Sequence, residues 1–226
     1  MDLDARLEPV LRQGFLSCLD AAEQRRLVEA GHPIELVARQ TLGPRVADGA
    51  IMVMLAGLLR IYLESPAGRQ VTVRYARPGD VLGLVHLLGA TTAVRAQAID
   101  AVTLFAFPGK QIQALGETNA AFALVIAREC ADRTVDAMEE LRLVTFGSVR
   151  QKISRHLLDL AACDATGALL ASVTQQELAD AAGTVREVVA RTLKEMRSDG
   201  LLGDSGVGIV LLDPRRLDDE SAGRVT

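Results

Sequence analysis

The chain has 226 residues, of which 49% are hydrophobic and only 3% aromatic, and it contains no tryptophan. This length suffices for one large or two modest domains, whose cores must be built mainly from Leu, Val, Ile and Ala. The net charge of −4 excludes binding of nucleic acid through overall charge, so any DNA-binding face has to be a local basic patch.

Residues 1 to about 30 are predicted to be helical, with Asp20 as the N-cap before AAEQRRLVEAG. From Ile34 to Pro108 the pattern changes to short strands separated by turn residues. The predicted turns are Ala56-Gly57, Ser65-Pro66-Ala67-Gly68 and Pro78-Gly79. Short strands at regular spacing favour an antiparallel sandwich or roll for this part of the chain.

The segment from Glu117 to Phe146 contains neither glycine nor proline and is predicted to form one helix about 45 Å long. Thr118 or Asn119 can cap its start, and Gly147 ends it. One stripe of residues repeats at alternating spacings of three and four, which is typical of a coiled-coil seam. The seam consists of Leu124, Ala127, Ala131, Thr134, Met138, Leu141 and Thr145. The alternative is that this face packs against the β-rich part of the same chain.

Phe146-Gly147-Ser148 follows as a predicted hinge, although Gly147 can instead serve only as the C-cap of the long helix. Ser148 and Gln151 have the spacing of a capping box, which predicts a new helix over VRQKISRHLLDLA.

The most specific pattern is TQQELADAAGTVREVVARTLKEMRSDGLL, from Thr174 to Leu202. Thr174 and Glu177 have capping-box spacing, Gly183 supplies a turn, and Thr184 with Glu187 repeats the box. Two short helices joined by a tight turn are the pattern of a helix-turn-helix, which reads the major groove of DNA. The alternative is a solvated amphipathic helix.

On a helical wheel the second helix separates into an inward and an outward side. The inward residues are Val185, Val188, Val189, Thr192, Leu193 and Met196, and the outward ones are Arg186, Glu187, Ala190, Arg191, Lys194 and Arg197.

The chemistry of these side chains assigns candidate roles on DNA. Arg186 and Arg191 can donate in a fork to the two major-groove acceptors of guanine, and Glu187 can accept from the cytosine amino group. Thr184, Thr174 and Gln175 stand at helix starts that suit phosphate contacts. Ala190 and Lys194 complete the expected DNA-binding set.

A predicted strand at Ile209 to Leu212, preceded by turn residues from Asp204 to Gly208, suggests a β-hairpin. This hairpin is expected to be the wing of a winged helix-turn-helix, or an ordinary hairpin that completes the core of a small domain.

At these residues the chain resembles the Crp/Fnr family of bacterial transcription regulators, including the Arg-Glu-x-x-x-Arg core at Arg186, Glu187 and Arg191. The stretch LAGLLRIYLESPAGRQVTVRYARPGDVLGL resembles the β-roll of a cyclic-nucleotide-binding domain. The resemblance implies a homodimer on a two-fold symmetric operator, with those three side chains on bases, and a DNA-binding domain that swings about the hinge. Activation would also require RNA polymerase as a partner.

The expected fold class is therefore α+β in three parts. These are an N-terminal antiparallel, jelly-roll-like β-roll with an N-terminal helix (1–116), a long dimerisation helix (117–146) and a C-terminal winged helix-turn-helix (147–226).

The resemblance also locates an effector pocket, but the residues that hold cAMP in the family are replaced here. Gly83 is followed by Leu84 instead of glutamate, the Arg-Ser slot falls on Thr92-Ala93, and the adenine-facing segment reads Val135-Asp136-Ala137-Met138. We therefore do not expect cAMP. His86 is a lone histidine without a second axial ligand, so we do not expect haem. Candidate pocket residues for an unknown small-molecule effector are Leu84, His86, Arg95, Gln97 and Met138, with Leu87 and Leu88 as apolar lining. The alternative is that the roll no longer binds any effector and that the protein binds DNA constitutively.

The remaining features define expectations about location, metals and rival functions. The first 30 residues lack a continuous apolar run, so we expect no signal peptide, no membrane span and a cytoplasmic location. Cys18, Cys130 and Cys163 form no metal-binding pattern and are expected to be buried or partly buried thiols. The rival function is a small-ligand receptor whose C-terminal helices serve protein contacts. No arrangement of residues suggests an enzyme.

Overall fold

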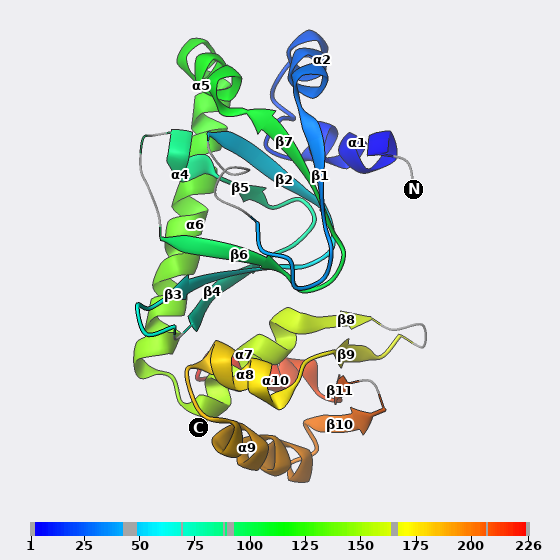
Figure 1. The fold of residues 1–226 in the computed structure, drawn as a ribbon, viewed down its shortest axis with the longest axis vertical. Coiled ribbons are helices and arrows are strands. Elements are labelled where there is room, and N and C mark those ends of the chain that lie inside the picture. The colour runs from blue at the N-terminus through cyan, green and yellow to red at the C-terminus, as the bar shows by residue number, and fades with distance from the viewer. Residues whose placement is uncertain are drawn as a thin grey trace. The chain divides into compact units, whose positions relative to one another are not determined.

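The computed structural model describes residues 3–42, 49–68, 70–87, 89, 93–163, 167–206 and 208–224 (Figure 1). The chain divides into two compact units, one formed by Met1–Leu63 and Val73–Ala137 and the other by Glu64–Thr72 and Met138–Thr226. No helix among the described residues is long and apolar enough to span a membrane.

The first unit begins with the helices α1 (Leu3–Gln13) and α2 (Ala21–Ala30). Asp20 caps α2 as predicted, since its side chain accepts hydrogen bonds from the N–H groups of Ala22 and Glu23. The Glu23 carboxylate accepts the Asp20 N–H in return, at 3.0 Å, which completes a capping box.

Among the described residues, the strands that follow α2 up to Pro108 form two sheets. One has the order β1 (His32–Leu36), β7 (Val102–Pro108), β2 (Ala50–Ala56) and β5 (Val81–Leu82), with antiparallel neighbours. The other has the order β4 (Gln70–Ala76), β3 (Leu59–Glu64) and β6 (Val94–Ala98). The antiparallel β-roll predicted from the turn residues is confirmed.

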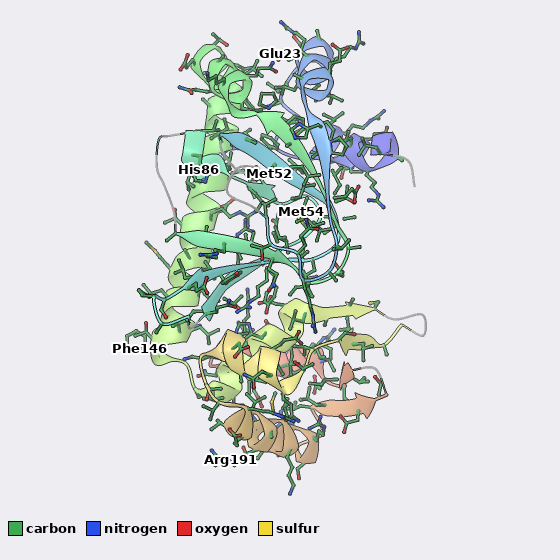
Figure 2. All side chains as sticks on the ribbon, viewed as in Figure 1. Glu23, Met52, Met54, His86, Phe146 and Arg191 are labelled. Atoms are coloured by element: carbon green, nitrogen blue, oxygen red, sulfur yellow. The ribbon has the colours of Figure 1, made fainter. Side chains whose placement is uncertain are left out.

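The alternation of side chains along β2 builds two apolar clusters, one on each face of its sheet. Met52 and Met54 pack with Leu59 and Ile61 of β3 in the interior of the roll (Figure 2). Ile51 and Val53 belong to the second cluster, which includes aromatic residues of β7 and residues of the surrounding helices. These helices are α1, α2, α5 (Gly109–Thr118) and the start of α6 (Ala120–Phe146).

The long helix α6 starts later than predicted. Glu117 and Thr118 belong to α5, and Asn119 interrupts the helix with an extended backbone. The Asn119 side chain accepts the N–H of Phe122 at 3.1 Å, so one of the two predicted caps is present. The predicted C-terminal end of the helix is confirmed. Helix α6 ends at Phe146, and the Gly147 N–H donates to the Leu143 carbonyl at 2.9 Å.

The second unit contains α7 (Val149–Leu160), β8 (Ala161–Cys163), β9 (Leu169–Ala171), α8 (Gln175–Ala182), α9 (Arg186–Ser198), β10 (Leu202–Ser205), β11 (Gly208–Leu211) and α10 (Pro214–Ser221). Its strands form a sheet in the order β10-β11-β9-β8. The Ser148–Gln151 capping box at α7 is present as predicted. Strands β8 and β9 and helix α10 were not predicted from the sequence.

The thiols differ in part from expectation: Cys18 and Cys163 are exposed, and only Cys130 is partly buried. The described residues include no group of His, Cys, Asp and Glu side chains that could hold a metal ion.

Candidate nucleic-acid interface

Helices α8 and α9 meet at the turn that the sequence predicted. Thr174 caps α8 by accepting the N–H of Glu177, whose carboxylate accepts the N–H of Thr174. Gly183 ends α8 in the left-handed conformation with φ of 65°, which glycine adopts without steric cost. The N–H of Thr184 donates to the Ala179 carbonyl at 2.9 Å, so Thr184 still belongs to the closing turn of α8.

Helix α9 consequently begins one residue later than predicted. Its N-cap is Val185, which offers no side-chain acceptor, rather than Thr184. The Val185 carbonyl accepts the N–H groups of Val188 and Val189 and so starts the helical hydrogen-bond pattern. Val185 was expected to pack inward, but it is 58% exposed because it stands at the cap, outside the helical stripe.

The body of α9 has the two faces that the sequence predicted. Its inward residues Val189, Thr192, Leu193 and Met196 are buried, and the apolar ones belong to a core cluster with residues of α7, α8 and the β-sheet. The outward residues Arg186, Glu187, Arg191 and Lys194 are exposed (Figure 2, where Arg191 is labelled). Ala190 and Thr184 are half-buried, Thr174 is exposed and Gln175 is half-buried. The four exposed outward residues of α9 therefore present three cations and one carboxylate to solvent from a rigidly packed base, and Glu195 is a second exposed carboxylate of α9.

Arg197 is the exception on the outward side. Its guanidinium lies 2.7 Å from Asp204 of β10 and joins the end of α9 to the hairpin β10–β11. The hairpin itself, LGDSGVGIVL, contains no lysine or arginine. Its apolar residues Leu202, Ile209 and Leu211 are buried in the core cluster, so the hairpin completes the core in addition to any contact with a partner.

Every residue of the predicted seam on α6 is exposed in the single chain. The seam residues are Leu124, Ala127, Ala131, Thr134, Met138, Leu141 and Thr145, of which Met138 and Leu141 are each 65% exposed. Phe122 and Leu143, which occupy the heptad position opposite the seam, are buried. From Leu124 to Thr134, where the seam belongs to the same unit as the roll, the alternative in which the seam packs against its own β-roll is therefore wrong. Val135 and Phe146 are further exposed apolar residues of α6 that the seam did not include.

The structure does not bring the candidate pocket residues together. Leu84 of α4 (Leu84–Leu87) is buried in the cluster between the sheet and the helices, against which Leu87 packs, and His86 is half-buried. Arg95 and Gln97 alternate on β6 with Ala96 and Ala98, which belong to the interior cluster, so both point away from the interior of the roll.

The remaining candidate residues do not form an effector pocket with Leu84 and His86 among the described residues either. The Gln97 amide donates to the Arg39 carbonyl at 3.0 Å, and Met138 belongs to the other unit. Leu88 and Thr92 lie outside the described residues. A groove of about 460 Å³ between α2 and α5 is lined by other residues, among them Glu23, Leu27, Gln111 and Leu115.

Comparison with known proteins bears on both units. The model of the Crp-like helix-turn-helix domain matches residues 151–220, and that of the cyclic nucleotide-binding domain matches residues 45–119. The transcriptional regulator LdrP of Thermus thermophilus is 33% identical over 171 residues, which cover 73% of this chain and 84% of LdrP. The chain belongs to the Crp/Fnr family of transcription regulators.

Other relatives and solved structures cover even more of the chain. The nitrogen fixation regulation protein FixK of Bradyrhizobium diazoefficiens is 28% identical over 208 residues, covering 89% of this chain and 87% of FixK. A solved structure of a Crp/Fnr-family regulator from Eubacterium rectale shares the fold with a TM-score of 0.73 at 20% identity, covering 90% of this chain and 95% of that one. FixK2 of Bradyrhizobium japonicum does so with a TM-score of 0.70 at 21% identity, covering 84% and 96%.

Proposed function

We propose that this Crp/Fnr-family chain acts as a homodimeric, sequence-specific DNA-binding transcription regulator on a two-fold symmetric operator. The observation that carries the proposal is the exposed face of α9, where Arg186, Glu187 and Arg191 project from a helix whose opposite side is buried. An exposed recognition helix on a packed helix-turn-helix is what insertion into a major groove requires.

The proposed roles follow from hydrogen-bonding chemistry. Arg186 and Arg191 read guanine through paired donors, while Glu187 accepts from cytosine. Lys194 contacts phosphate, and Ala190 leaves space for the base edges between the longer side chains. Thr184, Thr174 and Gln175 contact the DNA backbone near the helix starts, where free N–H groups favour anions.

Dimerisation is proposed to occur through the exposed seam of α6. A seam of alternating spacing allows two copies of the helix to pack side by side, with each apolar residue inserted between residues of the partner. Two recognition helices in such a dimer would address half-sites one turn of DNA apart, about 34 Å. The three functional parts are then the roll (1–116), the dimerisation helix (117–146, whose helical residues start at Ala120) and the DNA-binding domain (147–226).

Regulation is proposed to be a shift between two arrangements of the α6 pair. The effector, if the roll has one, is not proposed to be cAMP, because Gly83 is followed by Leu84, which is buried in the core. A cyclic nucleotide needs a buried cation or free amides for its phosphate, and the nearby Arg95 is exposed on the outer side of β6.

Selection of bound duplexes from a random pool, with and without a cell extract, tests the proposal. We expect an enriched two-fold symmetric site whose affinity falls steeply as salt is raised from about 50 to 200 mM. A receptor module whose C-terminal helices serve protein contacts predicts no salt-dependent binding of duplex DNA. Failure to enrich any duplex under both conditions would refute the proposed function.

A further inference from the structure

Arg150, in the first turn of α7, binds two carboxylates that come from the ends of two other helices. Its Nε and Nη2 atoms donate to the two carboxylate oxygens of Glu220 on α10, at 2.9 and 3.0 Å. Its Nη2 atom also lies 2.7 Å from Oδ2 of Asp199, the residue that ends α9. The Glu220 side chain is only 10% exposed, and the paired bonds are the strong bidentate form of an arginine–carboxylate contact.

Each of these charges stands at the unfavourable end of its own helix. Arg150 lies at the positive N-terminal end of α7, whereas Asp199 and Glu220 lie at the negative C-terminal ends of α9 and α10. A charge so placed opposes the helix dipole. Local helix stability therefore does not explain these residues, and the interaction that compensates is the contact among the three helix ends.

The same contact holds the end of the recognition helix. Besides the Asp199–Arg150 ion pair, the Asp199 carbonyl accepts a hydrogen bond from Arg216 of α10 at 3.3 Å. Gly200 then turns the chain with φ of 74°, and Leu201 is fully buried. The end of α9 is thus anchored to α7 and α10 by its side chain, its backbone and the residue pair that follows.

We propose that Arg150 is a positioning residue for DNA recognition, which fixes the orientation of α9 relative to the start of α7 through Asp199 and Glu220. The inference rests on the proposed function. Arg186 is 13 residues from Asp199, or about 20 Å along the helix. A rotation of about 5° at the anchored end moves Arg186 by about 2 Å, which is more than a hydrogen bond to a base tolerates.

Arg150 also lies close to the junction between α6 and α7. Arg150 follows Ser148, the cap of α7, by two residues, next to the end of α6 at Phe146. A change in direction of the chain at Gly147 therefore reaches α7 first, and the Arg150 contact carries it to α9 as a movement of one rigid body. This contact links α9 to α7 in addition to the apolar core cluster that the two helices share.

The test compares sequence-specific with non-specific binding in the full-length chain. The variants are Asp199→Asn, which removes the charge from the link to α9 and leaves at most an uncharged hydrogen bond, and Arg150→Lys, which keeps the charge but loses the fork. The matched control is Arg215→Lys, at an exposed arginine of α10. Affinity is measured for the selected operator and for an unrelated duplex of equal length at one salt concentration, and thermal unfolding is recorded for each protein.

We expect both variants to bind the operator about tenfold more weakly while affinity for the unrelated duplex stays within about twofold, and the control to change neither. Loss of a negative charge in Asp199→Asn alone would strengthen binding to both duplexes, so a selective loss cannot come from charge. If Arg150→Lys unfolds at the assay temperature, Asp199→Asn decides, because it retains the Arg150–Glu220 pair. An unchanged ratio of the two affinities in Asp199→Asn overturns the inference alone. Failure of the wild-type chain to bind either duplex overturns the proposed function and this inference with it.

Discussion

Asp80 and Arg133 join the β-roll to the long helix: Nη2 of Arg133 lies 2.7 Å from Oδ1 of Asp80 in the turn before β5. The other Asp80 oxygen accepts from Arg74 at 3.3 Å and from the N–H of Arg77 at 2.9 Å. Burial and the nearby Arg133 lower the pKa of Arg74. Burial alone would also lower the pKa of Arg133, but the charge and hydrogen bond of Asp80 raise it overall. One carboxylate therefore holds two arginines that would otherwise repel each other.

The first prediction concerns this carboxylate. Asp80→Asn leaves Arg74 and Arg133 without the charge that both share, so the free energy of unfolding should fall by about 1–2 kcal/mol, less than for a fully buried pair because the groups are partly exposed. Urea denaturation measures the change. Asp132→Asn, at an exposed acid of α6, is the control and should be neutral. Equal stabilities of the two variants would show that Asp80 contributes only a surface charge.

Local features of this fold could be predicted from the sequence, because their determinants lie within a few residues. The capping boxes at Asp20, Ser148 and Thr174 each need only a partner three residues later. Thr184 and Glu187 have the same spacing, but Thr184 is used to close the turn after α8, and the predicted cap is wrong for that reason. A spacing rule does not reveal which of two adjacent helices uses a residue.

Features that depend on distant residues were not predictable in this way. Arg150 and Glu220 are 70 residues apart, and the sequence offers only an indirect signal, namely acidic residues at the C-terminal ends of helices. Position along the chain does not predict which residues line a pocket, because a shift of one position along a strand moves a side chain to the other face, as it does for Arg95 and Gln97. The stripe on α6 could be read from the sequence because its period is intrinsic to one helix; its exposure is confirmed, and its role in a dimer stays a prediction.

The second prediction separates base contacts from phosphate contacts on α9. Arg191→Ala should cost about 1–3 kcal/mol of operator affinity and relax the preference at one base pair. Lys194→Ala should weaken binding to all sequences and lower the salt slope by about one. Binding of the two variants to operators changed at single positions, at several salt concentrations, provides the comparison. If Arg191→Ala kept the full sequence preference, the assignment of its base contact would be wrong.

The third prediction addresses the seam. Leu141→Glu places a charge at a 65% exposed position that the proposed dimer buries, so the protein should dissociate to monomers at micromolar concentration and lose operator affinity. Sedimentation equilibrium measures the change in mass. Asp132→Lys, on the same helix but outside the seam, changes the charge by more and should leave the association intact. A wild-type chain that is already monomeric would contradict the proposed dimer.

The fourth prediction is a pH dependence set by Glu140 near the end of α6. Burial raises the pKa of Glu140 from 4.5 to about 7, and the charge of Asp159 adds to the rise, whereas Arg155 and Lys152 oppose it. The folded protein thus holds this proton more tightly than the unfolded chain. Its contribution to stability is complete below about pH 4.5 and is lost as the pH rises through 7.

Glu140→Gln keeps the shape of the protonated side chain but cannot ionise. The variant should therefore be more stable than the wild type at pH 8, and the two should converge near pH 5. Urea midpoints recorded between these values give the comparison, with the exposed neighbour variant Glu139→Gln as control. A constant difference between Glu140→Gln and the wild type across this range would mean that Glu140 does not titrate near neutrality.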